Sequence, residues 1–365
     1  MDIHLVGGFL GSGKTTAILA AADEIVRVGK KVGIITNEQG KHLVDTHFLR
    51  ASGHPVLDVA GGCFCCHLDD FVERMDQIYA RHQPDVLFAE SVGSCTDLVA
   101  TIIKPLLEIQ EASAHPASFS VFTDSRLLLR WLKGQEMPFN DDIVYIFEQQ
   151  IEEANLLIVN KIDLLPEKEA MDILALVREK FFEKQVKTQN SLERADTLRW
   201  LEMIMSQAAR LPERSLDLDY DRYAQGEGRF FWIDREYAVR SDGGFPPGFF
   251  RGLVGRVVAK IKDQGVSIAH VKWLIQDGSG KKKFSLTAMD DTQVLTGQNK
   301  KWLDQVKDGS ANFLLNIMAE GELDVSGAVV DEEIAAYGAA SGITFSERSR
   351  FDRVPSYPRP TKRIL

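Results

Sequence analysis

A complete phosphate-binding loop near the start of the chain constrains the fold more than any other feature. Residues 8–15 read G-F-L-G-S-G-K-T, after a short apolar stretch and before a run of helix-forming residues. In this G-x-x-x-x-G-K-[ST] pattern, backbone N–H groups converge on the β-phosphate of a nucleotide. Lys14 would reach the β and γ oxygens, and the Thr15 hydroxyl would ligate Mg²⁺ at a helix N-terminus. The positions expected to bind the phosphates are Gly8, Gly11, Ser12, Gly13, Lys14, Thr15 and Thr16.

A second motif predicts which base the nucleotide carries. Residues 160–163 read N-K-I-D directly after the buried-strand pattern of residues 155–159. Guanine presents two adjacent donors that the Asp163 carboxylate can accept as a pair, whereas adenine would leave that carboxylate unpaired. Asn160 would brace the phosphate loop, and Lys161 would cover the base. The alternative is a strand end with solvated polar residues, but beside a phosphate loop the motif predicts GTP and GDP as ligands.

Two strand ends between these motifs carry acids. Glu90 opens the sequence E-S-V-G after an apolar stretch, and it can hold Mg²⁺ through water while the Gly93 N–H approaches the γ-phosphate. The alternative for Glu90 is an acid at the start of a helix. Residues 37–40 read N-E-Q-G and open a long connection, which is usually functional or mobile. We predict Lys14, Thr15 and Glu90 as the catalytic group, with Thr15 and Glu90 as Mg²⁺ ligands.

Three of the four cysteines lie within four residues, in the sequence G-G-C-F-C-C at residues 61–66. Cys63 and Cys65 would share a face of an extended segment, and the glycine pair could bring Cys66 round. Three thiolates suit Zn²⁺ or another soft ion and leave one coordination position open. Candidates for that position are Glu38, His67, Cys95 and a ligand from a partner protein. The alternatives are a redox thiol set and small residues that pack a strand end.

Together these motifs resemble the CobW-like GTPases, P-loop metallochaperones related to the urease and hydrogenase nickel-insertion GTPases. The five motifs follow the order of that family: G-G-F-L-G-S-G-K-T-T, N-E-x-G, G-G-C-x-C-C, E-S-x-G and N-K-x-D. The resemblance covers roughly residues 1–210. It implies slow GTP hydrolysis coupled to the handling of zinc, cobalt or a corrinoid, with C-x-C-C as the metal site. Gln39 departs from the family because an aromatic residue is usual there, and the chain has no His-rich metal store.

Three functions are compatible with this resemblance. The first is a Mg²⁺-dependent GTPase that carries a transition metal, Zn²⁺ or alternatively Co²⁺, on Cys63, Cys65 and Cys66 to a client metalloprotein. The second is a GTPase that escorts or reactivates a corrinoid-dependent enzyme. The third, a non-catalytic metal-responsive binding module, is disfavoured because the phosphate loop is intact. A homo-oligomer is compatible with each of them.

The net charge, the apolar runs and the distribution of cysteines limit the kinds of partner that we expect for this chain. The net charge of −10 argues against a nucleic-acid surface. No export signal is recognisable, and no apolar run approaches the ~18 residues that a membrane span needs. Clustered cysteines are the intracellular pattern rather than a disulfide framework. We therefore expect a cytoplasmic protein with neither nucleic acid nor membrane as a partner.

The order of strand-like and helix-like stretches predicts the domains. Their alternation over residues 1–212 predicts an α/β P-loop NTPase domain, with a mainly parallel sheet flanked by helices. We expect a linker at 213–228, a smaller α+β domain at 229–342 and an Arg/Pro-rich tail at 343–365. Such a tail is usually solvated or lies across the acidic body of the protein, and the alternative is a docking peptide for a partner.

Overall fold

The computed structural model describes the chain except for residues 39–43, 61, 110–114, 207–210, 291–305 and 307–308, and two strand-end side chains, those of Glu38 and Ala60, are also outside the description. The chain divides into two compact units, each built from separate stretches of sequence. The first unit consists of Met1–Gln39, Ser52–Glu227 and Tyr357–Leu365, and the second of Gly40–Ala51 and Gly228–Ser356. Within the described part of the chain, every helix is too short or too polar to cross a lipid bilayer.

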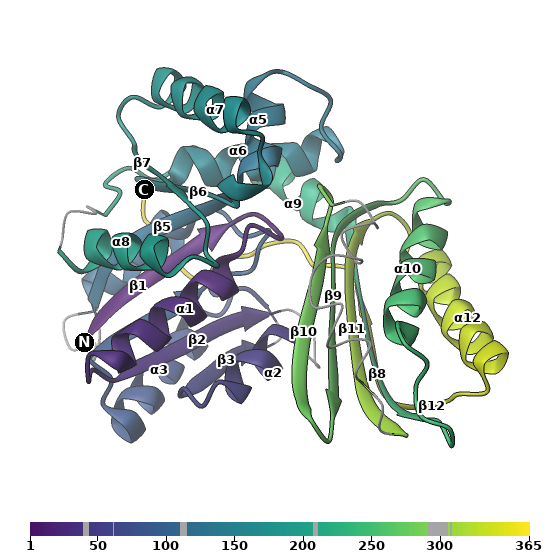
Figure 1. Ribbon diagram of the computed structural model, residues 1–365. Helices are drawn as coiled ribbons and strands as arrows, with labels where there is room; N and C mark the ends of the chain where they lie inside the picture. Colours follow the sequence, from purple (N-terminus) through teal and green to yellow (C-terminus); the bar gives the residue numbers. More distant parts are fainter. Residues whose placement is uncertain (39–43, 61, 110–114, 207–210, 291–305, 307–308) are drawn as a thin grey trace. The chain divides into compact units, whose positions relative to one another are not determined.

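The first unit is built on a seven-stranded sheet with the order β3-β2-β4-β1-β5-β6-β7 (Figure 1). Each of its pairings is parallel. The strands are β1 (Asp2–Gly8), β2 (Val32–Glu38), β3 (Val56–Ala60), β4 (Val86–Glu90), β5 (His115–Asp124), β6 (Leu156–Asn160) and β7 (Gln185–Gln189). Every residue of β4 and β6 is buried, as expected for parallel strands covered on both faces. The predicted parallel sheet flanked by helices is confirmed.

Helices flank this sheet (Figure 1). They are α1 (Lys14–Arg27), α3 (Leu68–His82), η1 (Val99–Ile103), α4 (Lys104–Glu108), α5 (Ser125–Leu132), α6 (Asp141–Glu153), η2 (Ile162–Leu164), α7 (Glu167–Lys180), α8 (Arg194–Met205) and α9 (Tyr220–Gly228). Local sequence fixes several helix starts. The Asp124 and Asn140 side chains accept hydrogen bonds from backbone N–H groups in the first turns of α5 and α6, which satisfies donors that the helix leaves unpaired.

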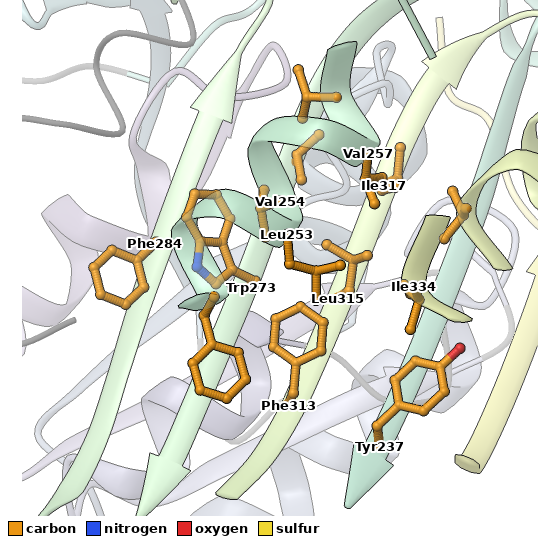
Figure 2. Close-up of a cluster of buried hydrophobic side chains, with 14 of the residues drawn as sticks. Tyr237, Leu253, Val254, Val257, Trp273, Phe284, Phe313, Leu315, Ile317 and Ile334 are labelled. Atoms are coloured by element: carbon orange, nitrogen blue, oxygen red, sulfur yellow. The ribbon is translucent and has the colours of Figure 1, made fainter. Parts of the chain in front are cut away.

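The second unit holds a five-stranded antiparallel sheet with the order β10-β9-β11-β8-β12. Its strands are β8 (Phe230–Arg240), β9 (Ser267–Asp277), β10 (Gly280–Thr287), β11 (Ser310–Glu320) and β12 (Thr344–Arg353), and its helices are α2 (Val44–Ala51), α10 (Phe249–Lys262) and α12 (Leu323–Ser341). The core lies between the sheet and the helices α10 and α12 (Figure 2). Leu253, Val254 and Val257 of α10 face apolar strand residues such as Trp273 and Phe313, because the 3,4 spacing places them on one helix face.

Helix α2 belongs to the second unit although it lies in sequence between two strands of the first unit. The Val44 N–H donates to Asn316 Oδ1 at 2.8 Å, and the buried Asp45 carboxylate accepts hydrogen bonds from Lys272 and Lys283. Burial alone would raise the pKa of Asp45, but the two ammonium groups hold that pKa well below its usual range. The Asp45 carboxylate is therefore charged and paired inside this unit.

Asp45→Asn is expected to lower the free energy of unfolding by about 1.5–3 kcal/mol at neutral pH, the usual worth of a hydrogen bond to a charged group. The folded-state pKa is depressed, so this stability is fully present above the ordinary carboxyl pKa of about 4 and declines progressively as the pH falls from there toward the much lower folded-state pKa. Urea unfolding of both proteins at pH 7 and pH 3 measures the effect. A difference that did not shrink at pH 3 would contradict the charged pair.

Two predicted segments have more structure than their sequences indicate. The expected linker at 213–228 contains α9, and its Tyr223 is buried in an apolar cluster with Tyr145, Ile146 and Leu218. The expected tail at 343–365 begins with β12, which pairs with β8 at the edge of the second sheet. Polar side chains dominate β12 because an edge strand is held mainly by backbone hydrogen bonds, so no apolar alternation marks it.

Candidate nucleotide and metal site

The phosphate loop joins β1 to α1 at the carboxyl edge of the parallel sheet. Gly8, Gly11 and Gly13 have φ values of +123°, +71° and +93°, which glycine adopts far more readily than other residues. A Cβ at Gly13 would lie 2.4 Å from the Asn160 amide nitrogen, so only glycine fits. Lys14 Nζ donates to the Gly8 carbonyl at 2.8 Å and to the next carbonyl at 3.2 Å, which holds the ammonium group over the loop.

Thr15 and Glu90, predicted as the Mg²⁺ ligands, lie in contact. The Thr15 hydroxyl donates to Glu90 Oε1 at 2.8 Å, and both residues are buried. Glu90 ends β4, between β1 and β2, which brings the carboxylate to the start of α1. A hydroxyl and a carboxylate oxygen suit Mg²⁺, which binds hard oxygen ligands. The structure therefore brings together two residues that are far apart in the sequence. Their role as Mg²⁺ ligands stays a prediction.

The segment after Glu90 packs against the phosphate loop. A Cβ at Gly93 would lie 2.7 Å from Leu10 Cδ2, so glycine allows this close approach. Gln150 of α6 donates to the carbonyls of Gly93 at 3.0 Å and of Cys95 at 2.8 Å, and thereby fixes the course of the segment. The Gly93 segment is therefore held between the phosphate loop and α6.

Asn160 connects the phosphate loop to the end of β7. Its amide nitrogen donates to the Ser12 carbonyl at 2.7 Å, and its oxygen accepts from the Ser191 N–H and hydroxyl at 3.1 and 2.9 Å. The sequence predicted the brace on the phosphate loop, but we did not predict Ser191. Its only sequence signal is the polar N-S pair at residues 190–191 after β7.

The remaining guanine-site residues lie just beyond β6. Lys161 has φ +59°, and its ammonium group lies 3.1 Å from Asp124 Oδ2. Asp163 lies in η2 with an exposed side chain, so its carboxylate is accessible to a base. Asp163 as the guanine-reading group stays a prediction.

The three neighbouring cysteines form one cluster of sulfur atoms after β3. Cys63 Sγ lies 2.6 Å from Cys65 Sγ and 3.3 Å from Cys66 Sγ, and the other two sulfurs are 3.8 Å apart. The Cys66 and His67 N–H groups both donate to the Cys63 carbonyl, and this turn brings Cys66 back toward Cys63. Tetrahedral zinc with Zn–S bonds of 2.3 Å separates its sulfurs by about 3.8 Å, so a bound ion would only have to spread the two closer pairs.

A single thiolate is favoured within this cluster. Hydrogen bonds from Cys65, Cys66 and Cys95 lower the pKa of Cys63 well below its usual range. Hydrogen bonding to Cys63 raises the pKa of Cys65 and of Cys95, and raises that of Cys66 to about 11. The buried Cys95, two residues after Gly93, therefore interacts with Cys63, although the close sulfur cluster itself consists of Cys63, Cys65 and Cys66. Metal binding to such thiols releases their protons.

Of two candidates for a fourth metal ligand, the structure describes the His67 side chain but not the Glu38 side chain. His67 Nδ1 lies 3.2 Å from Asp70 Oδ2, and its ring covers the backbone at Gly62, where a Cβ would be only 2.4 Å away. The Glu38 side chain lies outside the described part of the structure, as do Gln39, Gly40 and Gly61. Glu38 as a ligand stays a prediction.

Asn37 fixes the cysteine loop to the end of β2, a role that the sequence did not reveal. Its amide nitrogen donates to the carbonyls of Gly62 at 2.6 Å and of Val59 at 3.2 Å. Its oxygen accepts from the Phe64 N–H at 2.7 Å. The end of β2 and the cysteine loop therefore share one buried side chain.

Comparison with known proteins identifies a family and several relatives. The profile of the nucleotide-binding domain of CobW/HypB/UreG matches residues 2–187. The zinc chaperone CobW from Sinorhizobium sp is 29% identical over 185 residues, which are 44% of this chain and 51% of that protein. The zinc chaperone YeiR from Escherichia coli (strain K12) is 29% identical over 170 residues, 44% of this chain and 46% of that protein. The chain thus spans about half the length of these curated relatives.

Among solved structures, HypB from Helicobacter pylori in complex with nickel is similar at a TM-score of 0.41. The two are 15% identical, over 59% of this chain and 91% of that one.

Proposed function

Since the chain belongs to the CobW/HypB/UreG nucleotide-binding family, we propose that it is a GTPase that carries a transition-metal ion on Cys63, Cys65 and Cys66 and delivers it to a client protein. The observation that carries the proposal is the close sulfur cluster tied by Asn37 to the end of β2. Zinc is the first choice of cargo because two relatives are named zinc chaperones, and this favours metal delivery over the corrinoid alternative.

In the proposed mechanism, the chain's own residues provide charge and position. Lys14, already aimed across the phosphate loop, neutralises charge on the β and γ oxygens. Thr15 and Glu90 fit Mg²⁺, which when bound offsets the charge that develops on the phosphates. Asn160 keeps the loop in its binding shape through Ser12. Delivery of the metal also requires that the affinity of the cysteines for metal depends on which nucleotide is bound.

Two contacts support a link between the nucleotide and the metal. Asn37 joins the end of β2 to the cysteine loop, and the buried Cys95 thiol, two residues beyond Gly93, interacts with the Cys63 thiol. Both segments lie where a γ-phosphate is expected to rearrange the chain. If GTP and GDP favour different arrangements of these segments, the affinity of the cysteines for metal must differ between the two states.

The Zn²⁺ affinity is expected to differ by about 5- to 150-fold between the GDP state and the state with a non-hydrolysable GTP analogue. By reciprocity, Zn²⁺ must change the GTP/GDP preference by the same factor. Competition with a zinc chelator in each nucleotide state measures the difference. Replacing all three clustered cysteines by Ser is the control, and it should abolish tight Zn²⁺ binding while leaving GDP binding intact. Identical Zn²⁺ affinities in both states would show that nucleotide binding and metal binding are not coupled.

A further inference from the structure

The end of the chain lies along the cysteine cluster. Tyr357–Leu365, here called the terminal strap, belongs to the first unit. The Thr361 N–H donates to the Cys65 carbonyl at 2.9 Å, and the Thr361 hydroxyl donates to the Cys66 carbonyl at 2.9 Å. The Arg359 N–H donates to Cys66 Sγ itself at 3.2 Å. The strap thus contacts both the backbone that carries the thiols and one of the sulfur atoms.

A buried ion pair anchors the strap. The Arg363 guanidinium donates to Asp97 Oδ2 at 2.7 Å, and the Tyr220 hydroxyl donates to the same oxygen at 2.6 Å. Asp97 is fully buried, and a buried carboxylate is costly without a cation beside it. The Ile364 N–H also donates to the Ala100 carbonyl at 2.9 Å. Arg363 of the strap therefore supplies the positive charge that pairs with the buried Asp97, which lies two residues beyond Cys95 in the sequence.

The prolines of the strap restrict the backbone around one hydrogen-bond donor, the Arg359 N–H. Pro358 and Pro360 flank Arg359, and proline fixes its own φ and restricts the residue before it to extended conformations. Pro358 is buried, whereas the Arg359 side chain is exposed. The part of Arg359 that meets the cluster is thus its backbone N–H.

We propose that the terminal strap is part of the metal site, where it positions Cys66 and slows the release of the bound ion. This proposal rests on the proposed function. Cys66 is the only partly exposed thiol among the four cysteines of the chain, so an ion passes it on entering or leaving. An N–H that donates to a ligand sulfur stabilises the thiolate form that binds metal, and such supporting contacts typically change metal affinity by about 10- to 100-fold.

The test compares two substitutions at one position in the full chain. Arg359→Pro removes the N–H that Cys66 accepts, and the extended conformation required before Pro360 is one that proline adopts. Arg359→Ala keeps the N–H and removes only an exposed side chain, so it is the matched control. Zn²⁺ release into excess chelator is expected to be about 2- to 10-fold faster for Arg359→Pro, the worth of one hydrogen bond, and unchanged for Arg359→Ala.

A third variant replaces residues 357–365 with Gly and Ser at the same length, and its Zn²⁺ release is expected to be about 10- to 100-fold faster. Retained GDP binding shows that this variant is folded. Unchanged release in this variant and in Arg359→Pro would overturn the strap proposal alone. A failure of the unaltered chain to hold Zn²⁺ through its cysteines would overturn the proposed function as well.

Discussion

Asp163→Asn is expected to change the base preference of the nucleotide site from guanine to xanthine. A carboxylate at this position can accept two hydrogen bonds from guanine, whereas the carboxamide can donate one of its own to the xanthine oxygen. Discrimination that depends on a paired polar group can reach about 10⁴-fold, so the change should be large. Calorimetric titration with GDP, XDP and ADP measures it in both proteins.

The exposed position of Asp163 means that the substitution should change base recognition alone. Its side chain is exposed in η2, so the change should leave the fold of the first unit intact. Glu167→Gln, which removes another exposed carboxylate in the first turn of α7, is the matched control and should leave the GDP affinity unchanged. Equal affinities of the unaltered chain for GDP and ADP would show that Asp163 does not read the base.

Glu90→Gln is expected to reduce Mg²⁺-dependent GTP hydrolysis by about 10²- to 10³-fold, the usual cost of one preorganised electrostatic contact, while GDP binding is retained. The amide can still accept the Thr15 hydroxyl, so the buried hydrogen bond is kept while the negative charge is lost. Lys14→Ala should instead weaken nucleotide binding itself, because Lys14 is predicted to contact the phosphates whether or not a metal is bound. Steady-state phosphate release and nucleotide titration separate the two effects.

The two variants also control for each other. If Glu90→Gln turned over GTP at the rate of the unaltered chain, the acid on the metal side would have to lie elsewhere. If Lys14→Ala bound GTP as tightly as the unaltered chain does, the phosphate loop would not be the nucleotide site.

The sequence predicted best those parts of the molecule that depend on the spacing of residues close together in the chain. The phosphate loop needs glycines at set positions beside Lys14, so spacing alone predicts Gly8, Gly11 and Gly13, and all three have left-handed φ values. The parallel sheet was predictable for a similar reason, since continuous apolar runs such as β6 indicate strands buried on both faces.

The parts that sequence did not predict depend on contacts between distant residues. Asn37 is a polar residue at a strand end by sequence, and only the fold shows that it holds the cysteine loop. Ser191 gains its partner Asn160 from 31 residues away. The sequence left open whether the tail is solvated or lies across the protein, because the anchors of the terminal strap, Arg363 to Asp97 and the Thr361 hydrogen bonds, contribute no local pattern.

The assignment of α2 to the second unit has a consequence for how the chain is made. Asp45 must wait for Lys272, which lies 227 residues later in the sequence. At a synthesis rate of about 5–20 residues per second, that interval lasts roughly 10 to 50 s. During that time α2 leaves the ribosome with its apolar face uncovered and its acid unpaired, while β2 and β3 on either side of it can already begin to pair. Aggregation during synthesis should therefore concentrate on residues 44–51, and a chaperone that binds short apolar segments has its best opportunity there.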